Sequence, residues 1–326
     1  LRRTNLANAL LRGAILRGAS LRGASLIGAN LTDADLREKN AVPAEMIEAI
    51  LVSADLTRAR LQGALAIQAD FSDALMNGCT LAGANLREAD FENASLDGAD
   101  LSGSMLADAD FTGAVLTGAR LDGADTEETV FASTLTDAPA GKGWIHDETA
   151  KGAIDLHTQW VETGGREGKP ADFSGFDLRH LAVPAGSVLN GLIAPHAILC
   201  GLDLSRLRLS GADFAGADLR GVKFAGADLR GVDFSGAKLS FADFRDARIG
   251  PLMVKGGRLL PARFDGATAR KTDFRGSDLS RAEFAGCDLS GTDFAGTSLR
   301  NTDLADTDLT GTKLSVSRLA ELYAIT

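Results

Sequence analysis

Large apolar residues recur every five positions along two long stretches of the chain. In the first stretch they run in one phase from Leu6 to Leu121, and in the second from Leu199 to Leu319. A small residue, usually Ala, stands two positions before almost every one of them in the first stretch. A period of five matches neither the helical period of 3.6 nor the strand period of 2, so neither element could keep these side chains on one buried face. A chain that turns a corner once per five residues can.

Each five-residue unit is therefore expected to contribute a short extended piece followed by a bend. The large residue and the small residue two before it then point inward, while the polar residues between them face water. A Gly often ends the unit, which suits a bend because Gly tolerates backbone angles that other residues resist.

The number of sides is indicated by residues 211–244, which read GADFAGADLRGVKFAGADLRGVDFSGAKLSFADF. Phe and Leu alternate at the large position. If a turn has four sides, each residue lies over the one 20 positions later and every column holds one residue type, whereas three sides would mix the types. We expect four sides. The expected columns are Phe214 on Phe234 with Phe274 and Phe294 further along, Phe224 on Phe244, Phe264 and Phe284, and a Leu column of Leu219, Leu239, Leu259, Leu279 and Leu299.

The units ADLRG, ADFAG and ANLRE resemble those of the pentapeptide repeat family. The resemblance implies an all-β fold, a right-handed quadrilateral parallel β-helix, here in two blocks with short capping helices. The end turns of such a solenoid need caps, because their backbone groups are unpaired. The expected division of the chain is a first acidic β-helix at 1–136, a linker with a capping helix at 137–170, and a second β-helix with a short C-terminal cap at 171–326.

Two breaks in the repeat are the expected protein contacts. Residues 37–53 place Ile47 and Ile50 outward, and we interpret this segment as a looped-out helical turn, with a degenerate continuous coil as the alternative. Residues 181–200 shift the phase by one between Leu178 and Leu199, which predicts an irregular coil around Leu192 and Ile193. Exposed apolar side chains have no packing role on a regular solenoid, so they indicate binding.

The remaining breaks are expected to cover the ends of the coils. DETAKGAIDLHTQWVETGGREGKP, within 136–170, predicts a helix and resembles the capping helix that precedes the first coil in many pentapeptide repeat proteins. Its candidate capping residues are Trp160 and Val161. Near the C-terminus, Leu319, Leu322 and Tyr323 have helical spacing. The resemblance leaves open a homodimer through this terminal cap beside capping alone.

The net charge of the chain limits the classes of partner that it can bind. The net charge of −10 argues against direct nucleic-acid binding, because affinity for phosphate needs clustered Lys and Arg. On four sides, Asp70, Asp90 and Asp110 fall in one outward column. The quinolone-resistance proteins, which are similar in fold, bind DNA gyrase by imitating DNA, so the resemblance offers this column as a DNA mimic. The alternative is that Asp is only the repeat consensus, and in the second stretch Lys223 and Lys238 replace it.

No arrangement of residues indicates catalysis. The three cysteines are far apart and the four histidines have no Glu or Cys at metal-ligand spacing, so we expect no catalytic, metal or cofactor site. No apolar run has membrane-spanning length, and a cytoplasmic location is expected. The sequence predicts a non-catalytic, rigid scaffold for protein–protein interaction with an unknown partner. The alternative is a DNA-mimicking modulator of a type II topoisomerase, DNA gyrase.

Overall fold

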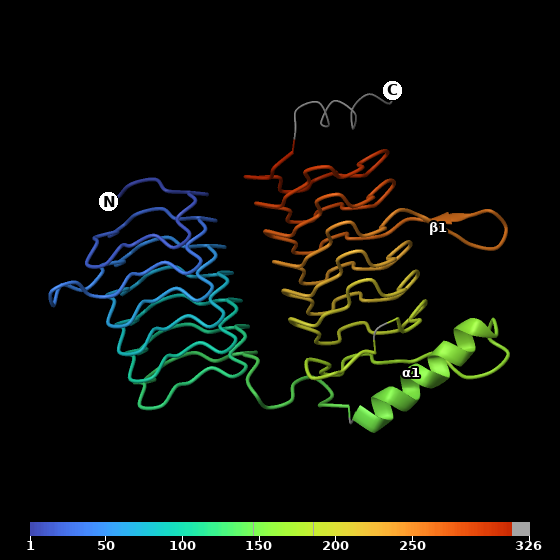
Figure 1. Ribbon diagram of the computed structural model, residues 1–326, viewed down its shortest axis with the longest axis horizontal. Helices are drawn as coiled ribbons and strands as arrows, with labels where there is room; N and C mark the ends of the chain where they lie inside the picture. The colour runs from blue at the N-terminus through green and yellow to red at the C-terminus, as the bar shows by residue number, and fades with distance from the viewer. Residues whose placement is uncertain (146, 185, 315–326) are drawn as a thin grey trace. The chain divides into compact units, whose positions relative to one another are not determined.

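The computed structural model describes residues 1–145, 147–184 and 186–314 (Figure 1). Short parallel bridges join residues that lie 20 apart, such as Asp70 with Asp90 and Asp213 with Asp233. Because one bridge forms per five residues, each turn has four sides, which confirms the prediction from the alternation of Phe and Leu. Contacts divide the chain into two units, Leu1–Ala138 and Pro139–Thr326, and each unit contains a coil of its own.

The regular pentads repeat one local geometry, for which Asp90 to Ala94 serve as an example. Asp90 forms the bridge, and the backbone N–H of Phe91 donates to the carbonyl of Asp110 on the next turn (2.7 Å). The N–H of Ala94 donates back to the carbonyl of Phe91 (2.9 Å), which closes the bend. Asn93 stands at the bend with φ 56°, in the left-handed region that Gly and Asn adopt most readily. The five-residue period is thus set by the bend.

The core of the first unit is a stack of inward columns. One column consists of phenylalanines from successive turns, with ring centroids 5.0, 4.5 and 5.4 Å apart; its members are Phe71, Phe91, Phe111 and Phe131. The three inner interfaces bury large rings in parallel, offset-stacked geometry, which contributes beyond the area removed from water. Phe131 ends the column and is 40% exposed.

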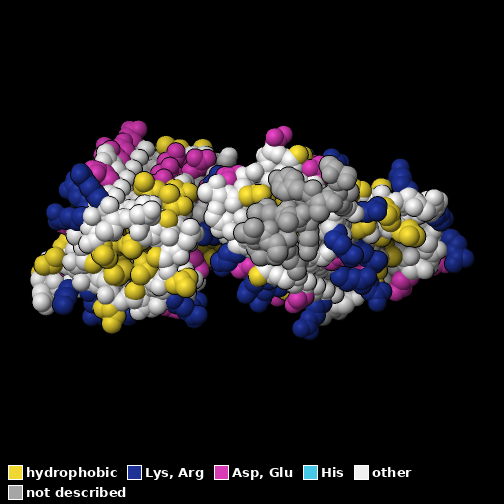
Figure 2. Space-filling view, turned by 90° about the horizontal axis from the view of Figure 1, so that it is seen from above, with side chains coloured by type: hydrophobic (Ala, Val, Ile, Leu, Met, Phe, Trp, Pro, Cys, Tyr) yellow, Lys and Arg dark blue, Asp and Glu magenta, His cyan; other side chains and the backbone are white. Residues whose placement is uncertain are grey.

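Apolar side chains are exposed at the N-terminal end of the first coil. Figure 2 looks onto this end, where hydrophobic side chains gather on the surface. Leu10 is 88% exposed and Ile15 is 81% exposed. Both stand at the outward bridge position, where most pentads carry a polar residue.

Residues 37–53 contain a five-residue insertion in the first coil. Ser20 bridges Glu45, a spacing of 25 instead of 20. The extra residues form a small loop in which Lys39 and Val42 exchange two backbone hydrogen bonds (2.9 and 3.0 Å). No helix forms in residues 37–53, all of which the structure describes, so the predicted helical turn is wrong.

The apolar residues that resembled a helix face belong to the pentad pattern instead. Ala44, Met46 and Ala49 take inward positions and are fully buried. The coil resumes its regular bends at this point, so the continuous coil that was the alternative describes residues 44–53.

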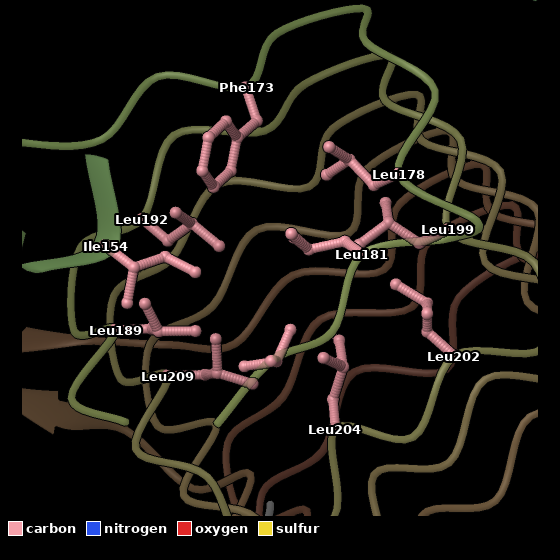
Figure 3. A pocket seen from close by; sticks show the side chains of 11 residues that line it. Ile154, Phe173, Leu178, Leu181, Leu189, Leu192, Leu199, Leu202, Leu204 and Leu209 are labelled. Carbon is pink, nitrogen blue, oxygen red and sulfur yellow. The ribbon is translucent and has the colours of Figure 1, made fainter. Parts of the chain in front are cut away.

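Helix α1 (Asp147–Glu162) lies near the start of the second unit and packs on the first turn of its coil. Ile154 is 3% exposed and joins Phe173, Leu189 and Leu192 in the core (Figure 3). A cavity of about 10 Å³ remains among these apolar side chains. Such a volume holds at most about one water molecule, and an apolar lining keeps it dry, so it is a packing gap and no ligand site.

The predicted one-residue shift between Leu178 and Leu199 is confirmed. Asp172 bridges Ile193 and Asp177 bridges Ile198, a spacing of 21 in both cases. The extra residue lies within the segment that the sequence marked as irregular.

A hairpin interrupts the second coil, and the sequence analysis did not predict it. Strand β1 (Leu252–Met253) pairs antiparallel with strand β2 (Leu259–Leu260), and the hairpin projects from the coil in Figure 1. Asp233 consequently bridges Arg263, 30 positions later. Met253 is 70% exposed.

The hairpin changes the predicted order of the columns. The rings stack as Phe214, Phe234, Phe264 and Phe284 in one column and as Phe224, Phe244, Phe274 and Phe294 in the other. The predicted columns beyond Phe244 are therefore wrong, because ten inserted residues move the later turns by two sides. Leu259 lies in β2 and takes no part in a Leu column.

Candidate functional site

Five outward residues of the first coil form one column along a single face. Bridges join Ile50 to Asp70, Asp70 to Asp90, Asp90 to Asp110, and Asp110 to Val130. Ile50 is 40% exposed and Val130 is 44% exposed, so apolar side chains border a row of three carboxylates. We call these five residues the acidic column. The sequence placed the three aspartates together, whereas it treated Ile50 as part of a separate contact and missed Val130.

The aspartates of the column have a local structural role. One carboxylate oxygen of Asp70 accepts hydrogen bonds from the backbone N–H of Ser72 (2.9 Å) and from its hydroxyl (2.7 Å). Asp90 accepts the same backbone bond from Glu92 (2.8 Å), and Asp110 forms an equivalent one. This side-chain bond to the residue two positions on fixes the bend, so the fold itself explains an Asp at this position.

Stacking these carboxylates has an electrostatic cost. The pKa of Asp90 is raised, first because the group is partly desolvated and then because the charges of Asp70, Glu92 and Asp110 lie close to it. Carboxylates directly opposite each other on neighbouring strands repel. A positive group placed on the column would relieve this repulsion.

Charge is distributed unevenly along the first coil. Residues 1–60 contain nine basic and six acidic residues, a net charge of +3, whereas residues 61–138 contain two basic and fourteen acidic residues, a net charge of −12. The acidic column lies mainly in the second of these segments. Its field is consequently not cancelled by neighbouring cations.

The second coil neutralises its carboxylates. There an Arg often stands two positions after the bridging Asp. Its guanidinium forms an ion pair with that carboxylate, with N···O distances of 2.6–2.7 Å. Such pairs are Asp177–Arg179, Asp218–Arg220, Asp228–Arg230, Asp243–Arg245 and Asp273–Arg275. At the same position the acidic column carries Ser, Glu and Thr, which leaves its charge uncompensated.

A sequence comparison identifies the family. Eight copies of the family model described as pentapeptide repeats match the chain, across residues 1–38, 54–93, 94–131, 185–221, 212–249, 262–294 and 277–315. The chain belongs to the pentapeptide repeat family. Members of this family fold as right-handed quadrilateral β-helices, in agreement with the four-sided coils described above.

Solved structures of other pentapeptide repeat proteins are similar to this chain. HetL, involved in heterocyst differentiation regulation in the cyanobacterium Nostoc sp. strain PCC 7120, is 23% identical over 93% of this chain and 91% of its own, with a TM-score of 0.25. Rfr23 from the cyanobacterium Cyanothece 51142 is 26% identical over 36% of this chain and 87% of its own, with a TM-score of 0.30. QnrB1, a plasmid-mediated fluoroquinolone resistance protein, is 17% identical over 75% and 94%, with a TM-score of 0.22. No curated protein matches the chain.

The predicted protein contact at Leu192 and Ile193 of this pentapeptide repeat protein required both side chains to be exposed, and the structure contradicts this for Leu192. Leu192 is 4% exposed and belongs to the core of the second unit, so its predicted exposure is wrong. In this pentad the large and the small inward side chains are exchanged: Leu192 occupies the inward position that usually holds Ala, and Ala194 occupies the one that usually holds Leu or Phe. Ile193 is half-buried at the bridge position between Asp172 and Asp213.

Ile47 lies at a bend of the first coil. It is half-buried, and its carbonyl accepts a hydrogen bond from the N–H of Gly23 (2.9 Å). The structure therefore brings Ile47 to the edge beside Ile50 and the acidic column.

The predicted capping residues of α1 are half-buried, whereas two others on the helix are more deeply buried. Trp160 and Val161 are half-buried, but Ile154 is 3% exposed and His157 is fully buried. The Nδ1 atom of His157 accepts a hydrogen bond from the backbone N–H of Ala171 (2.9 Å), so this nitrogen carries no proton. Burial lowers the pKa of His157. The C-terminal candidates Leu319, Leu322 and Tyr323 lie outside the described residues.

The described residues of the pentapeptide repeat protein were also searched for metal sites, membrane-spanning helices and reactive thiols. Within it, no group of three or more His, Cys, Asp or Glu side chains is placed to hold a metal ion. Nor does any helix among these residues have the length and apolar character to cross a membrane. Burial raises the pKa of the thiols of Cys79 and Cys287 to about 12, which makes both poor nucleophiles at neutral pH.

Proposed function

We propose that this pentapeptide repeat protein is a non-catalytic scaffold that binds a protein partner through the acidic column. The observation that supports this proposal is the column itself, in which exposed Ile50 and Val130 border three uncompensated carboxylates on consecutive turns. The apolar ends supply area to bury, and the carboxylates supply specificity for a cationic surface.

The chemistry of the column defines the partner. A partner with Lys or Arg side chains spaced by about 4.8 Å, the separation of neighbouring strands, would neutralise one carboxylate per turn. The pKa of Asp90 is raised first by desolvation and then by the neighbouring charges, which include Asp70 and Asp110, and a cation placed there would offset this repulsion. Binding of this kind weakens as salt rises.

The proposal is tested by removing charge without removing the bend. Asn keeps the side-chain oxygen that accepts the backbone N–H, so D70N/D90N/D110N should fold and lose only the charge. With the full chain as bait for affinity capture and quantitative mass spectrometry, we expect the triple variant and I50D each to lose a partner that the wild type retains. D213N/D303N/D308N is the matched control, because these three aspartates of the second coil accept the same backbone bond from Ala215, Ala305 and Thr310. Equal capture by wild type and triple variant would remove the acidic column as the site.

We further propose that α1 caps the second coil through Ile154, His157, Trp160 and Val161, and that the C-terminal segment covers the other end or mediates a homodimer. The three cysteines are free thiols, which fits a reducing compartment such as the cytoplasm.

A second candidate is that the first coil imitates DNA and modulates a type II topoisomerase. Residues 61–138 have a net charge of −12 over about four turns. At about 4.8 Å per turn this is roughly one charge per 1.6 Å, close to the value of about one per 1.7 Å for duplex DNA. In a gyrase supercoiling assay, the wild type should inhibit or protect the enzyme and the triple variant should not. Absence of any effect at micromolar protein would exclude this candidate.

A further inference from the structure

Along one edge of the first coil, the charges are arranged so that a second, antiparallel copy of the same edge would place opposite charges against each other. The edge consists of the bend residues three and two positions before each residue of one outward column of bridges, which runs from Asn5 and Ser25 through the five residues of the acidic column, and we call it the charged edge. Backbone hydrogen bonds stack its bends on one another: Arg3 N to Arg22 O, Gly23 N to Ile47 O, Glu48 N to Ile67 O, Gln68 N to Arg87 O, Glu88 N to Ala107 O, and Asp108 N to Glu127 O.

The charged edge is basic at one end, apolar at its centre and acidic at the other end. Ile67 and Gln68 form the central bend, the fourth of seven. In order from the first turn, the bends are Arg2–Arg3, Arg22–Gly23, Ile47–Glu48, Ile67–Gln68, Arg87–Glu88, Ala107–Asp108 and Glu127–Glu128.

We propose that a second copy of this chain docks antiparallel along the charged edge, around a two-fold axis at Ile67. Reversal about the central bend brings the two basic bends at one end opposite the two acidic bends at the other end. Arg2 and Arg3 then face Glu127 and Glu128 of the second copy. Each contact forms twice, as the symmetry of a closed dimer requires.

Of the inner pairs, one follows the same rule, whereas the other includes the bend of Arg87 and Glu88, which has no net charge. Arg22 faces Asp108 of the second copy, and Glu48 faces Arg87 of the second copy. At the centre, Ile67 meets its own counterpart, which places an apolar contact on the axis. A parallel arrangement would instead bring Arg onto Arg and Glu onto Glu, and such like-charge contacts cost free energy. The pattern therefore selects the antiparallel arrangement.

The ion pairs that these side chains form within the chain do not prevent docking. Arg2 lies 3.2 Å from Glu45, Arg22 lies 3.6 Å from Glu48 and Arg87 lies 3.9 Å from Asp125, and the six side chains are 32–68% exposed. Exposed pairs of this kind contribute little to stability, so they can exchange partners across an interface.

The dimer is expected to be weak and sensitive to salt. The charged edge spans six intervals of about 4.8 Å, roughly 29 Å in all. A single edge of this length buries less than the roughly 1,600 Å² of a standard interface, so a dissociation constant in the micromolar range is expected. The docking uses the edge beside the acidic column and does not rest on the proposed function.

Sedimentation equilibrium of the full chain at 5–200 µM tests the proposal. In 20 mM NaCl the wild type should fit a monomer–dimer equilibrium whose dissociation constant rises at least tenfold in 500 mM NaCl. R22D and D108R should each weaken the dimer at least tenfold, and R22D/D108R should restore it, because the double variant re-forms the pair with inverted signs. D97R is the control, since exposed Asp97 lies on the diagonally opposite edge and the change in charge equals that of D108R.

Three results would overturn the proposal. The first is a wild type that remains monomeric at 200 µM in 20 mM NaCl. The second is a loss of dimer in D97R as large as in D108R, which would indicate a general effect of net charge. The third is a double variant, folded by circular dichroism, that stays as weak as the single variants.

Discussion

The rings of Phe91 and Phe111 lie parallel on consecutive turns, with centroids 4.5 Å apart and planes inclined by 5°. Both side chains are fully buried. F91A would open a cavity that the neighbouring turns cannot fill, at a cost of about 3–5 kcal/mol in the free energy of unfolding.

The two tryptophans allow the affected unit to be identified. Trp144 and Trp160 both belong to the second unit, so their fluorescence follows that unit while far-ultraviolet circular dichroism follows both. In urea, F91A should move the circular dichroism transition of the first unit and leave the fluorescence transition unchanged. F131A is the matched control, because Phe131 is 40% exposed and should cost much less. A fluorescence shift in F91A as large as the dichroism shift would contradict the independence of the two cores.

Asp35 should contribute more to stability than the neighbouring Asp33. The Asp35 side chain is 3% exposed and lies 2.9 Å from Arg37 and 3.2 Å from Arg60, and the hydrogen bonds from arginine hold its pKa well below the usual value. D35N should cost about 2 kcal/mol, as expected for hydrogen bonds to a charged group. D33N removes a carboxylate that is 40% exposed and bonded to Arg58, and should cost clearly less than D35N.

The pH dependence of these variants follows from the sign of the shift. A carboxyl group whose pKa is lower in the folded state stabilises the protein above its unfolded pKa of about 3.9, and this stabilisation is lost as the pH falls. The difference between wild type and D35N in urea unfolding should therefore shrink between pH 6 and pH 3. A constant difference would mean that Asp35 acts through packing alone.

The coil itself could be predicted because its period of five excludes the other regular structures. The one-residue shift near Leu192 was also visible, since it changes the phase of the pattern. The break at 37–53 was predicted but interpreted as a helical turn, whereas the hairpin of β1 and β2 was not predicted. The two insertions comprise five and ten residues, which are whole pentads and leave the phase of the pattern intact. All five members of the acidic column are 20 residues apart, so a four-sided coil predicts the whole column. Ile50 and Val130 were not assigned to it because the sequence analysis followed only the aspartates along this face.

His157 makes the stability of the second unit depend on pH. Its Nδ1 atom accepts the Ala171 N–H and its pKa is lowered by burial, so the folded state holds a neutral imidazole. The unfolded state takes up a proton below about pH 6.5, so stability falls as the pH drops through that value. Fluorescence-monitored unfolding of the wild type should show this loss between pH 7.5 and pH 5.5.

H157N separates titration from hydrogen bonding. The Asn oxygen can replace Nδ1 as the acceptor but does not titrate in this range. The variant should be less stable at pH 7.5, because the ring volume is lost, and should lose less stability on acidification. An equal loss in both proteins would show that His157 is not the group responsible.

Two glycines with the same backbone angle report how the hairpin packs. Gly231 and Gly236 both have φ 65°, where an L side chain costs about 1–2 kcal/mol. A methyl group on Gly231 would also meet the Cβ of Leu252 in β1 at 2.6 Å, whereas no atom lies within 4 Å of one on Gly236. G231A should therefore destabilise the second unit by at least about 1 kcal/mol more than G236A, a typical cost of overpacking.

Deletion of the hairpin tests the source of this difference. Removing residues 251–260 and changing Pro261 to Gly leaves one regular bend between Ile249 and Phe264, because the insertion comprises two whole pentads. The shortened chain should keep its fluorescence-monitored unfolding transition, because a change in the length of a surface loop alters the free energy of unfolding only slightly. In this background G231A and G236A should become equally costly, because Leu252 is gone. If the excess cost of G231A persisted without the hairpin, the contact with Leu252 would not be its cause.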